Sequence, residues 1–260
     1  MFISEPQYLP GVTRLIAEYV IKYGEYMDSP ESWKPEYFDL ISEDEQFRIN
    51  DYIGYEDFKT FNQFFTRDIK PWKRPIGDGF IAPCDGVVQN VLSVIGGKAE
   101  AKVKTSLFHS MDALLDMRSR INQGTLIDIY LNVFDCHRVY CPDDADIVSV
   151  TKIPGGNYVG GFVEYLNGHY VLDSSEYGWQ AIETRTVIEM QTNTRGLIYL
   201  VMVGMSHIGS VEVSVRPAQH VKKGDEIGMF KFGGSGVILV LQGEVKTKKR
   251  HYLARETLIK

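Results

Sequence analysis

From Pro75 onward, apolar and polar positions alternate in short runs that glycine, proline, asparagine and aspartate separate. Alternation with a period of two is typical of strands that bury one face, and the separating residues favour turns. The pattern predicts one helix near Ser110–Met117 and a loop over residues 154–184, where glycine, asparagine and tyrosine are frequent. It also predicts strands at Gly86–Ile95, Thr125–Val133, Ile147–Ile153, Thr186–Thr192, Leu197–Gly204, Ser210–Arg216 and Val237–Leu241.

Before Pro75, apolar positions recur every three or four residues, which is the period of a helix. We expect one amphipathic helix over Gly11–Met27, docked on the core because its polar face mixes acidic and basic side chains. A second helix is expected over Tyr55–Ile69, and Trp33–Asp51 should mix short helices with loops. The chain is therefore predicted to be an α+β protein, with an N-terminal helical region at residues 1–75 and a β-rich domain at residues 76–260.

Composition narrows the range of partners and compartments. The 260 residues carry a net charge of −6, which disfavours a nucleic-acid partner and gives no general attraction to an anionic membrane. The three cysteines form no CxxC pair, so no metal site is expected, and a reducing, cytoplasmic compartment is the simplest home. The first residues lack a signal-peptide pattern, and no apolar run approaches the length of a transmembrane helix. Peripheral membrane contact and a homodimer both stay open.

One segment, Lys223–Leu241, contains a candidate for unusual chemistry. Gly233 and Gly234 come directly before Ser235, and glycine reaches backbone angles that bring a serine oxygen against the preceding carbonyl carbon. Attack of Ser235 Oγ on the Gly234 carbonyl would convert the amide into an ester. β-Elimination would then split the chain between residues 234 and 235 and leave a pyruvoyl group on the new N-terminus. The alternative is an ordinary glycine bulge between two strands.

Five motifs, in this order along the chain, resemble those of the phosphatidylserine decarboxylases. They cover roughly residues 55–242. The motifs are FNQFFTRDIKPWKRPI (Phe61–Ile76), APCDGVV (Ala82–Val88), FDCHRVYCP (Phe134–Pro142), VGMSHIGSVEV (Val203–Val213) and KKGDEIGMFKFGGS (Lys222–Ser235).

This resemblance implies a fold, a cofactor and a set of site residues. The fold would be a β-rich core of the barrel-sandwich type with N-terminal helices, and residues 76–260 would form the catalytic domain. The cofactor would be a pyruvoyl group derived from Ser235, with no need for pyridoxal phosphate. Asp85 would be the orienting acid of an Asp-His-Ser triad that cleaves the chain at Gly234-Ser235. Taken alone, an aspartate in a DG turn is more often structural.

The sequence departs from the family at the histidine of that triad. Family members carry two histidines three residues apart, the first serving decarboxylation and the second completing the triad. Here the first is His137 and the second position holds Tyr140, whose hydroxyl, with a pKa of roughly 10, is a weak base. On a strand these two positions face opposite sides, so a shared pocket requires a bend, which Cys141-Pro142 could supply.

Two other histidine roles follow from this departure. His207 is the candidate for a relocated base, because the family normally has no histidine at this position of the VGMSHIGS motif. The alternative for His207 is a packed or surface residue. His137 is expected to return a proton to the substrate after carbon dioxide leaves, since imidazole holds a proton near neutral pH. The alternative for His137 is a buried histidine bonded to backbone.

Three functional hypotheses remain open. The first is a pyruvoyl-dependent carboxy-lyase that converts the phospholipid phosphatidylserine to phosphatidylethanolamine. The second keeps the reaction but replaces the lipid by a small amino acid, which the acidic chain favours, as does Gly236 in place of the threonine common in lipid-acting relatives. The third is a non-processed binding protein that kept the fold, and Tyr140 is its main support.

Two groups of basic residues have simpler expected roles. Arg67 and Arg74 are expected to form structural ion pairs, although Arg67 in the FFTR motif could also contact a carboxylate or phosphate. The basic stretch Lys246–His251 is expected to be a solvated end.

Overall fold

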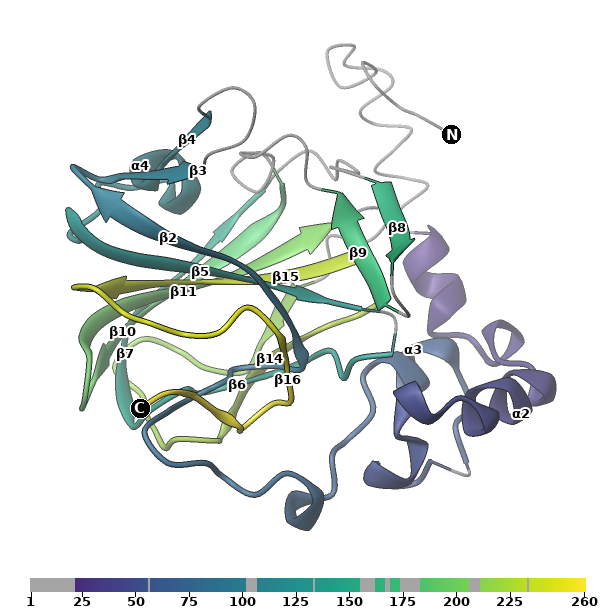
Figure 1. The fold of residues 1–260 in the computed structure, drawn as a ribbon. Coiled ribbons are helices and arrows are strands. Elements are labelled where there is room, and N and C mark those ends of the chain that lie inside the picture. The colour runs from purple at the N-terminus through teal and green to yellow at the C-terminus, as the bar shows by residue number, and fades with distance from the viewer. Residues whose placement is uncertain are drawn as a thin grey trace.

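The computed structural model describes residues 22–55, 57–101, 107–132, 134–154, 162–166, 169–173, 183–205, 211–232 and 234–260. Within these ranges the chain has the predicted α+β fold and is dominated by strands. Most of the helices belong to the first part of the chain and lie to one side of the sheets, drawn in purple in Figure 1.

The helices are short, and local sequence explains where several of them begin. They are η2 (Pro30–Ser32), α2 (Pro35–Glu43), η3 (Glu45–Phe47), η4 (Ile49–Asp51), α3 (Phe61–Phe65), η5 (Pro71–Lys73) and α4 (Met111–Leu115), and residues 22–27 are also helical. The side-chain oxygen of Thr60 accepts from the backbone N–H of Gln63 at the start of α3. That of Ser110 does the same for Ala113 in α4. Such caps satisfy backbone donors that a helix leaves unpaired.

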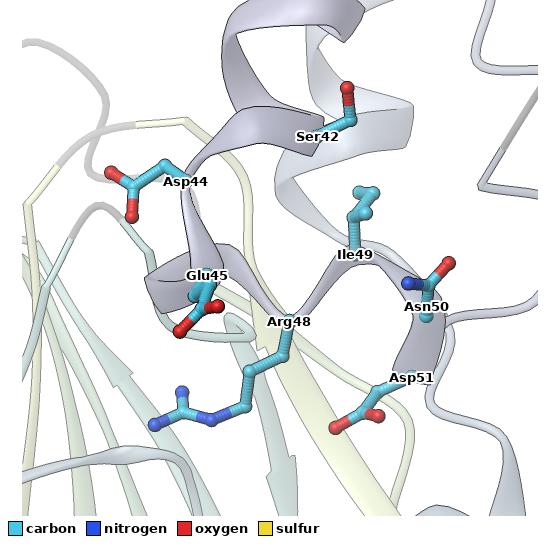
Figure 2. A pocket seen from close by; sticks show the side chains of 7 residues that line it. All are labelled: Ser42, Asp44, Glu45, Arg48, Ile49, Asn50 and Asp51. Carbon is cyan, nitrogen blue, oxygen red and sulfur yellow. The ribbon is translucent and has the colours of Figure 1, made fainter.

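The helical side carries a surface pocket of about 320 Å³. It follows the segment from the end of α2 to η4, and the side chains of Arg48 and Asp51 extend to the same side of this segment (Figure 2). The lining residues are Ser42, Asp44, Glu45, Arg48, Ile49, Asn50 and Asp51.

A ten-stranded antiparallel sheet forms the main layer, and β15 lies in its interior between β11 and β5. The strand order is β13-β7-β10-β11-β15-β5-β2-β3-β4, with β16 also paired to β2. Over the described residues the sheet is open rather than closed. The strands are β2 (Gly86–Ile95), β3 (Lys98–Ala101), β4 (Leu107–Ser110), β5 (Gln123–Leu131), β7 (Ala145–Ile153), β10 (Arg185–Thr192), β11 (Gly196–Met205), β13 (His220–Val221), β15 (Gly234–Gln242) and β16 (His251–Tyr252).

Three smaller sheets complete the described part of the chain. A three-stranded sheet has the order β12 (Val211–Val213), β14 (Glu226–Phe230) and β6 (Arg138–Tyr140). β1 (Phe80–Ile81) pairs with β17 (Thr257–Ile259), so the end of the chain returns to the start of the β-rich part. β8 (Phe162–Leu166) pairs with β9 (His169–Asp173).

The apolar side chains form three buried clusters. The first cluster joins one face of the ten-stranded sheet to the three-stranded sheet and includes Leu131, Val139 and Val237. The second lies on the opposite sheet face, where α4 adds Met111, and the third includes Tyr52 and Tyr140 and joins the helical part to β6. Each fully buried aliphatic side chain contributes about 2 kcal/mol relative to an exposed one. The alternation of apolar residues along a strand therefore decides which of its two faces packs against each cluster.

The predicted strands are confirmed in position, although Ser210–Arg216 is a strand only at β12, and two other expectations are wrong at least in part. The helix expected over Tyr55–Ile69 is limited to α3, because Thr60 caps its start and Ile69 forms a bridge with Tyr52. Part of the expected loop at residues 154–184 is the β8–β9 pair, and the rest of it except 154, 183 and 184 lies outside the described residues. The Lys246–His251 stretch is largely exposed, as expected, but its last residue begins β16. Most of the helix expected over Gly11–Met27 also lies outside the described residues.

Candidate active site

Ser235 is the second residue of β15 and is fully buried. Its Cα partners are Gly204 on β11 and Leu131 on β5. Ser235 Oγ has no hydrogen-bond partner among the residues that the structure describes. A buried hydroxyl without a partner costs about 1–3 kcal/mol, so this atom is unusual for a serine with a purely structural role.

The hydroxyl faces the layer between the two sheets. Side chains alternate along a strand, so Ser235 shares a face with Val237, and directly opposite residues such as Leu131 point the same way. Both of these apolar residues belong to the first cluster, which also contains Val139 of β6. Ser235 therefore points into the protein interior toward the side of the three-stranded sheet.

Helix α3 fixes the segment that leads into the glycine-serine junction. The backbone N–H of Phe232 donates to Asn62 Oδ1 at 2.9 Å, and the ring of Phe232 lies 5.4 Å from that of Phe65. Phe65 also stacks on the imidazole of His137 at 3.7 Å between ring centroids. The carbonyl of His137 accepts from the N–H of Phe230 at 2.8 Å. One aromatic ring thus connects His137 to the residues just before Gly233 and Gly234, of which Gly233 lies outside the described residues.

His137 is a buried, neutral imidazole with a defined tautomer. Its side chain is 1% exposed, and Nδ1–H donates to the carbonyl of Asp135 at 2.9 Å. Burial, with the nearby charge of Arg67, holds the pKa of His137 well below its usual 6.5, although the bond to Asp135 opposes this. The lone pair is then on Nε2, where the low pKa makes it a weak base, and a buried histidine bonded to backbone is the alternative that the sequence left open for His137. His137 can return a proton to the substrate only after it has taken one up during the reaction.

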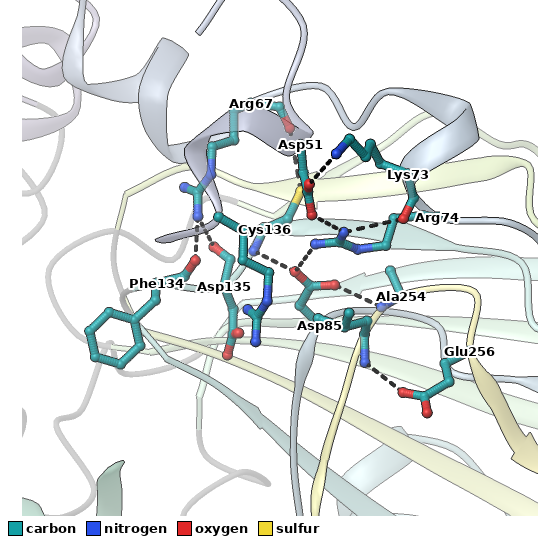
Figure 3. Close-up of polar contacts among 12 residues, drawn as sticks. Asp51, Arg67, Lys73, Arg74, Asp85, Phe134, Asp135, Cys136, Ala254 and Glu256 are labelled. Carbon is teal, nitrogen blue, oxygen red and sulfur yellow. Dashed lines mark hydrogen bonds and ion pairs between the residues drawn. The ribbon is translucent and has the colours of Figure 1, made fainter. Parts of the chain in front are cut away.

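Asp85 lies at the centre of a buried polar network (Figure 3). Its oxygens accept from the backbone N–H groups of Ala254 at 2.7 Å and Cys136 at 3.3 Å. Arg74 Nη2 lies 3.7 Å from Asp85 Oδ2, and Arg74 also pairs with Asp51. Burial opposes the charge of Arg74, but the two carboxylates raise its pKa above the usual value. The expected ion pair of Arg74 is confirmed. Asp85 binds the backbone N–H of Cys136, next to His137, and it binds no histidine ring among the described residues.

Gly86, the residue after Asp85, lies directly against β5. Its φ of +154° and its contact with β5 exclude a side chain, because an added Cβ would lie 2.7 Å from the carbonyl of Tyr130. The DG pair therefore places a carboxylate at the point where β2 begins to pair with β5.

Tyr140 packs away from Ser235. Its ring belongs to the third cluster, whereas the preceding residue, Val139, belongs to the first cluster that Ser235 faces. Burial raises the pKa of the Tyr140 hydroxyl, and the Arg255 guanidinium lies 4.5 Å from the ring centroid. The structure therefore does not bring Tyr140 to the serine, and a raised pKa makes its hydroxyl less able to lose a proton.

His207 lies outside the described residues. The described part of β11 ends at Met205, whose Cα partner is Gly234.

Arg67 differs from its expected role. It is 1% exposed and forms no ion pair with a described carboxylate. Instead it donates to the carbonyls of Phe64, Phe134 and Asp135, and the bond to Asp135 is 3.0 Å long. The guanidinium thereby fixes the turn at Phe134 and Asp135 (Figure 3), directly before Cys136 and His137.

Two residues of the site were missed by sequence reasoning. Asp135 is 1% exposed, and its Oδ1 lies 2.7 Å from Nε2 of His251, a residue of β16. The position of Asp135 two residues before His137 is a signal that could have identified it. His251 carried none, because its basic surroundings are typical of a solvated segment.

Comparisons with known proteins show which sequences this chain resembles. The family model described as phosphatidylserine decarboxylase matches residues 61–259. Phosphatidylserine decarboxylase proenzyme 2 of Oryza sativa subsp. japonica is 31% identical over 242 residues, which cover 89% of this chain and 37% of the relative. The phosphatidylserine decarboxylase proenzyme of Chlamydia felis is 31% identical over 198 residues, which cover 73% of this chain and 62% of the relative. L-tryptophan decarboxylase of Psilocybe cyanescens is 28% identical over 227 residues, which cover 78% of this chain and 50% of the relative. The matched part of this chain thus spans 37–62% of the length of these relatives.

Proposed function

The chain belongs to the phosphatidylserine decarboxylase family, and from this premise we propose that it is a self-cleaving decarboxylase proenzyme. Its substrate would be phosphatidylserine, which it would convert to phosphatidylethanolamine and carbon dioxide. The observation that carries the proposal is Ser235 Oγ, which is fully buried, without a partner among the described residues, and directly preceded by Gly234.

Self-cleavage would use only groups of this chain and water. Ser235 Oγ attacks the Gly234 carbonyl carbon, and the C–N bond breaks to leave an ester and a free amine. Loss of the Ser235 α-proton then breaks the Cβ–O bond, which releases residues 1–234 with a terminal carboxylate. Water converts the unsaturated residue left at position 235 into a ketone, and ammonia leaves. A base for the hydroxyl and donors for the developing oxyanion are the two requirements.

The residues around Ser235 fit this cofactor. Phosphatidylserine decarboxylase proenzymes are pyruvoyl-dependent, and their pyruvoyl group derives from a serine after cleavage. Such a group supplies a ketone that condenses with the substrate amine and accepts the electrons released when carbon dioxide leaves. His137 would take up and return protons through Nε2, and Asp85 would hold the backbone that carries it.

A small amino acid is the second candidate substrate. Two relatives support it, the L-tryptophan decarboxylases of Psilocybe cyanescens and Psilocybe cubensis, which are 28% and 27% identical to this chain. The chemistry at Ser235 would be unchanged, because both substrates offer an amine beside a carboxylate.

Intact-mass analysis of the purified protein under denaturing conditions tests the proposal first. Two chains, residues 1–234 and 235–260, are expected, the shorter one beginning with a ketone that borohydride reduces. A single unmodified chain would instead support the third hypothesis, a non-processed binding protein. Carbon dioxide release from phosphatidylserine vesicles and from a panel of free amino acids then separates the two substrates.

Four further features complete the proposal. The first cluster, which joins two sheets, supports a β-rich catalytic domain of the barrel-sandwich type at residues 76–260. Buried, unpaired cysteines at positions 84, 136 and 141 support a cytoplasmic location. None of the helices in the described ranges could span a membrane. We also propose that the protein contacts a membrane surface when it acts on a lipid, and that a homodimer is the assembly to test.

A further inference from the structure

The C-terminal segment brings a second histidine to the candidate active site. His251 Nε2 lies 2.7 Å from Asp135 Oδ1, and the side chains are 28% and 1% exposed, respectively. His251 reaches this position because β16 pairs with the start of β2, opposite Val87. Three residues later, the N–H of Ala254 donates to Asp85. Two contacts from residues 251–254 therefore reach the two buried carboxylates beside His137.

Asp135 connects His251 to His137 through a single residue. Its carboxylate accepts from His251 and from the backbone N–H of Asn132 at 2.7 Å. Its carbonyl accepts from His137 Nδ1 at 2.9 Å and from Arg67. The orientation of the His137 ring depends on that carbonyl, and the position of the carbonyl depends on how the carboxylate is held. A change at His251 is thus transmitted over one residue to the His137 imidazole.

The surroundings of His251 favour its charged form. The charged groups that act on it are Asp135 from the turn after β5, Asp85 just before β2, Arg48 between η3 and η4, and Glu256, whose pKa His251 helps to lower. Burial and Arg48 oppose protonation, but the hydrogen bond to Asp135 and the charges of Asp135 and Asp85 outweigh them, so the pKa of His251 is raised above 6.5. Without this partner, Asp135 would keep a buried negative charge near Asp85, and the turn would have to rearrange.

We propose that His251 is a positioning residue of the active site, which holds Asp135 so that the His137 imidazole keeps Nε2 toward the reacting groups. This inference rests on the function proposed above. It also gives the segment after the cleavage point a task beyond carrying Ser235, because residues 235–260 would orient a histidine of the longer fragment.

The protein supplies a matched control pair. His220 Nδ1 lies 2.8 Å from Asp146 Oδ1, but this pair is 58% and 70% exposed and lies on β13 and β7, at one edge of the main sheet. An exposed pair of this kind contributes little and positions no site residue. His220→Ala therefore removes the same chemistry without touching the turn that carries His137.

The test compares His251→Ala, His251→Gln and His220→Ala in the full chain. His251→Ala is expected to lower kcat for decarboxylation roughly tenfold with KM nearly unchanged, because a small misplacement of a reacting group is costly. Gln keeps an N–H donor at a reach similar to Nε2 but does not titrate. His251→Gln should therefore restore most of the rate, and the decline of wild-type activity as His251 loses its proton at higher pH should disappear. His220→Ala should resemble the wild type.

A readout that needs no activity keeps the two proposals separable. Nitrogen-15 NMR of histidine in the uncleaved Ser235→Ala background should show protonated Nδ1 at His137, and adding His251→Ala should mix the two tautomers. If His137 keeps its tautomer and kcat follows the His220→Ala control, the positioning role is wrong. If the wild type is never cleaved, the proposed function fails, while the NMR result still decides the role of His251.

Discussion

Two buried parts of the candidate active site differ in how their polar groups are satisfied. Around Asp85 and Asp135, carboxylate oxygens accept from Ala254, Cys136 and Asn132, and Arg74 or His251 adds charge. At the glycine-serine junction, the equally buried Ser235 Oγ has no partner among the described residues.

If the proposed function is right, this difference separates the scaffold from the reacting group. A carboxylate with several donors is held in one position and is stabilised by them, so it orients backbone and does little chemistry itself. A buried hydroxyl without donors or acceptors keeps its lone pairs available, which a nucleophile needs. Mutations in the two regions should accordingly affect different measurements.

The largest effect is expected from Ser235→Ala, which removes the nucleophile. Cleavage and decarboxylation should both be abolished, while the fold persists, because the lost hydroxyl makes no described hydrogen bond. Intact mass and circular dichroism together measure this. A chain that is still cut at residue 234, or an active uncut variant, would remove the pyruvoyl mechanism.

Asp85→Asn should act mainly on stability. The change leaves Arg74, which is 3% exposed, with one fewer buried countercharge, and we expect the free energy of unfolding to fall by about 3 kcal/mol. Urea denaturation of the uncleaved Ser235→Ala background measures it. The exposed Asp146→Asn is the control and should cost less than about 0.5 kcal/mol. Equal losses in both variants would mean that the network around Asp85 is not the scaffold described above.

The effects of two mutations on the cleavage rate should show whether His207 or Tyr140 is the base. His207→Ala is expected to slow cleavage roughly 100-fold if His207 is the relocated base, since a general base contributes at least that much. Tyr140→Phe should have little effect, because the ring faces the third cluster and only its hydroxyl is lost. Time courses of cleavage after synthesis in vitro provide the comparison. The reverse order of rates would reject relocation to His207.

The smallest effect concerns the pH dependence of stability, where the two histidines on Asp135 should act in opposite directions. The depressed pKa of His137 means that stability is lost as the pH falls below about 6.5, where only the unfolded chain takes up the proton. The raised pKa of His251 means that its contribution is complete below 6.5 and is lost as the pH rises through the folded-state pKa.

His251→Gln should therefore remove only the loss at higher pH. Urea unfolding at a series of pH values in the Ser235→Ala background measures it. A loss at higher pH that is unchanged in His251→Gln would assign it to another group.

The sequence predicted the strands well, because alternation is a local pattern. The interval Gly86–Ile95 coincides with β2, and the predicted strand Val237–Leu241 lies inside β15. The helix expected over Tyr55–Ile69 failed for a non-local reason, since Ile69 pairs with Tyr52 and the apolar spacing serves the third cluster rather than one helix face. Short strands such as β16 and β17 also depend on distant partners, which alternation does not reveal.

The site was predictable where a residue lies within a motif. The sequence selected Asp85, His137 and Ser235. In the structure, Asp85 binds the backbone of Cys136 in the turn at 134–137, and the carbonyl of His137 binds Phe230 in β14, the strand before the glycines. His251 was not predictable, because its importance comes from a pairing with Asp135 across 116 positions of the chain. Arg67 was assigned an ion pair, but its partners are backbone carbonyls, which a sequence does not identify.

The interior position of β15 limits the lifetime of an enzyme made in this way. After cleavage, the short fragment would still lie between β11 and β5, and β17 would still pair with β1. The fragment cannot be exchanged for a fresh copy without dismantling the main sheet. Each polypeptide would therefore prepare its ketone once, and a molecule whose ketone is destroyed by a side reaction could be replaced only by new synthesis.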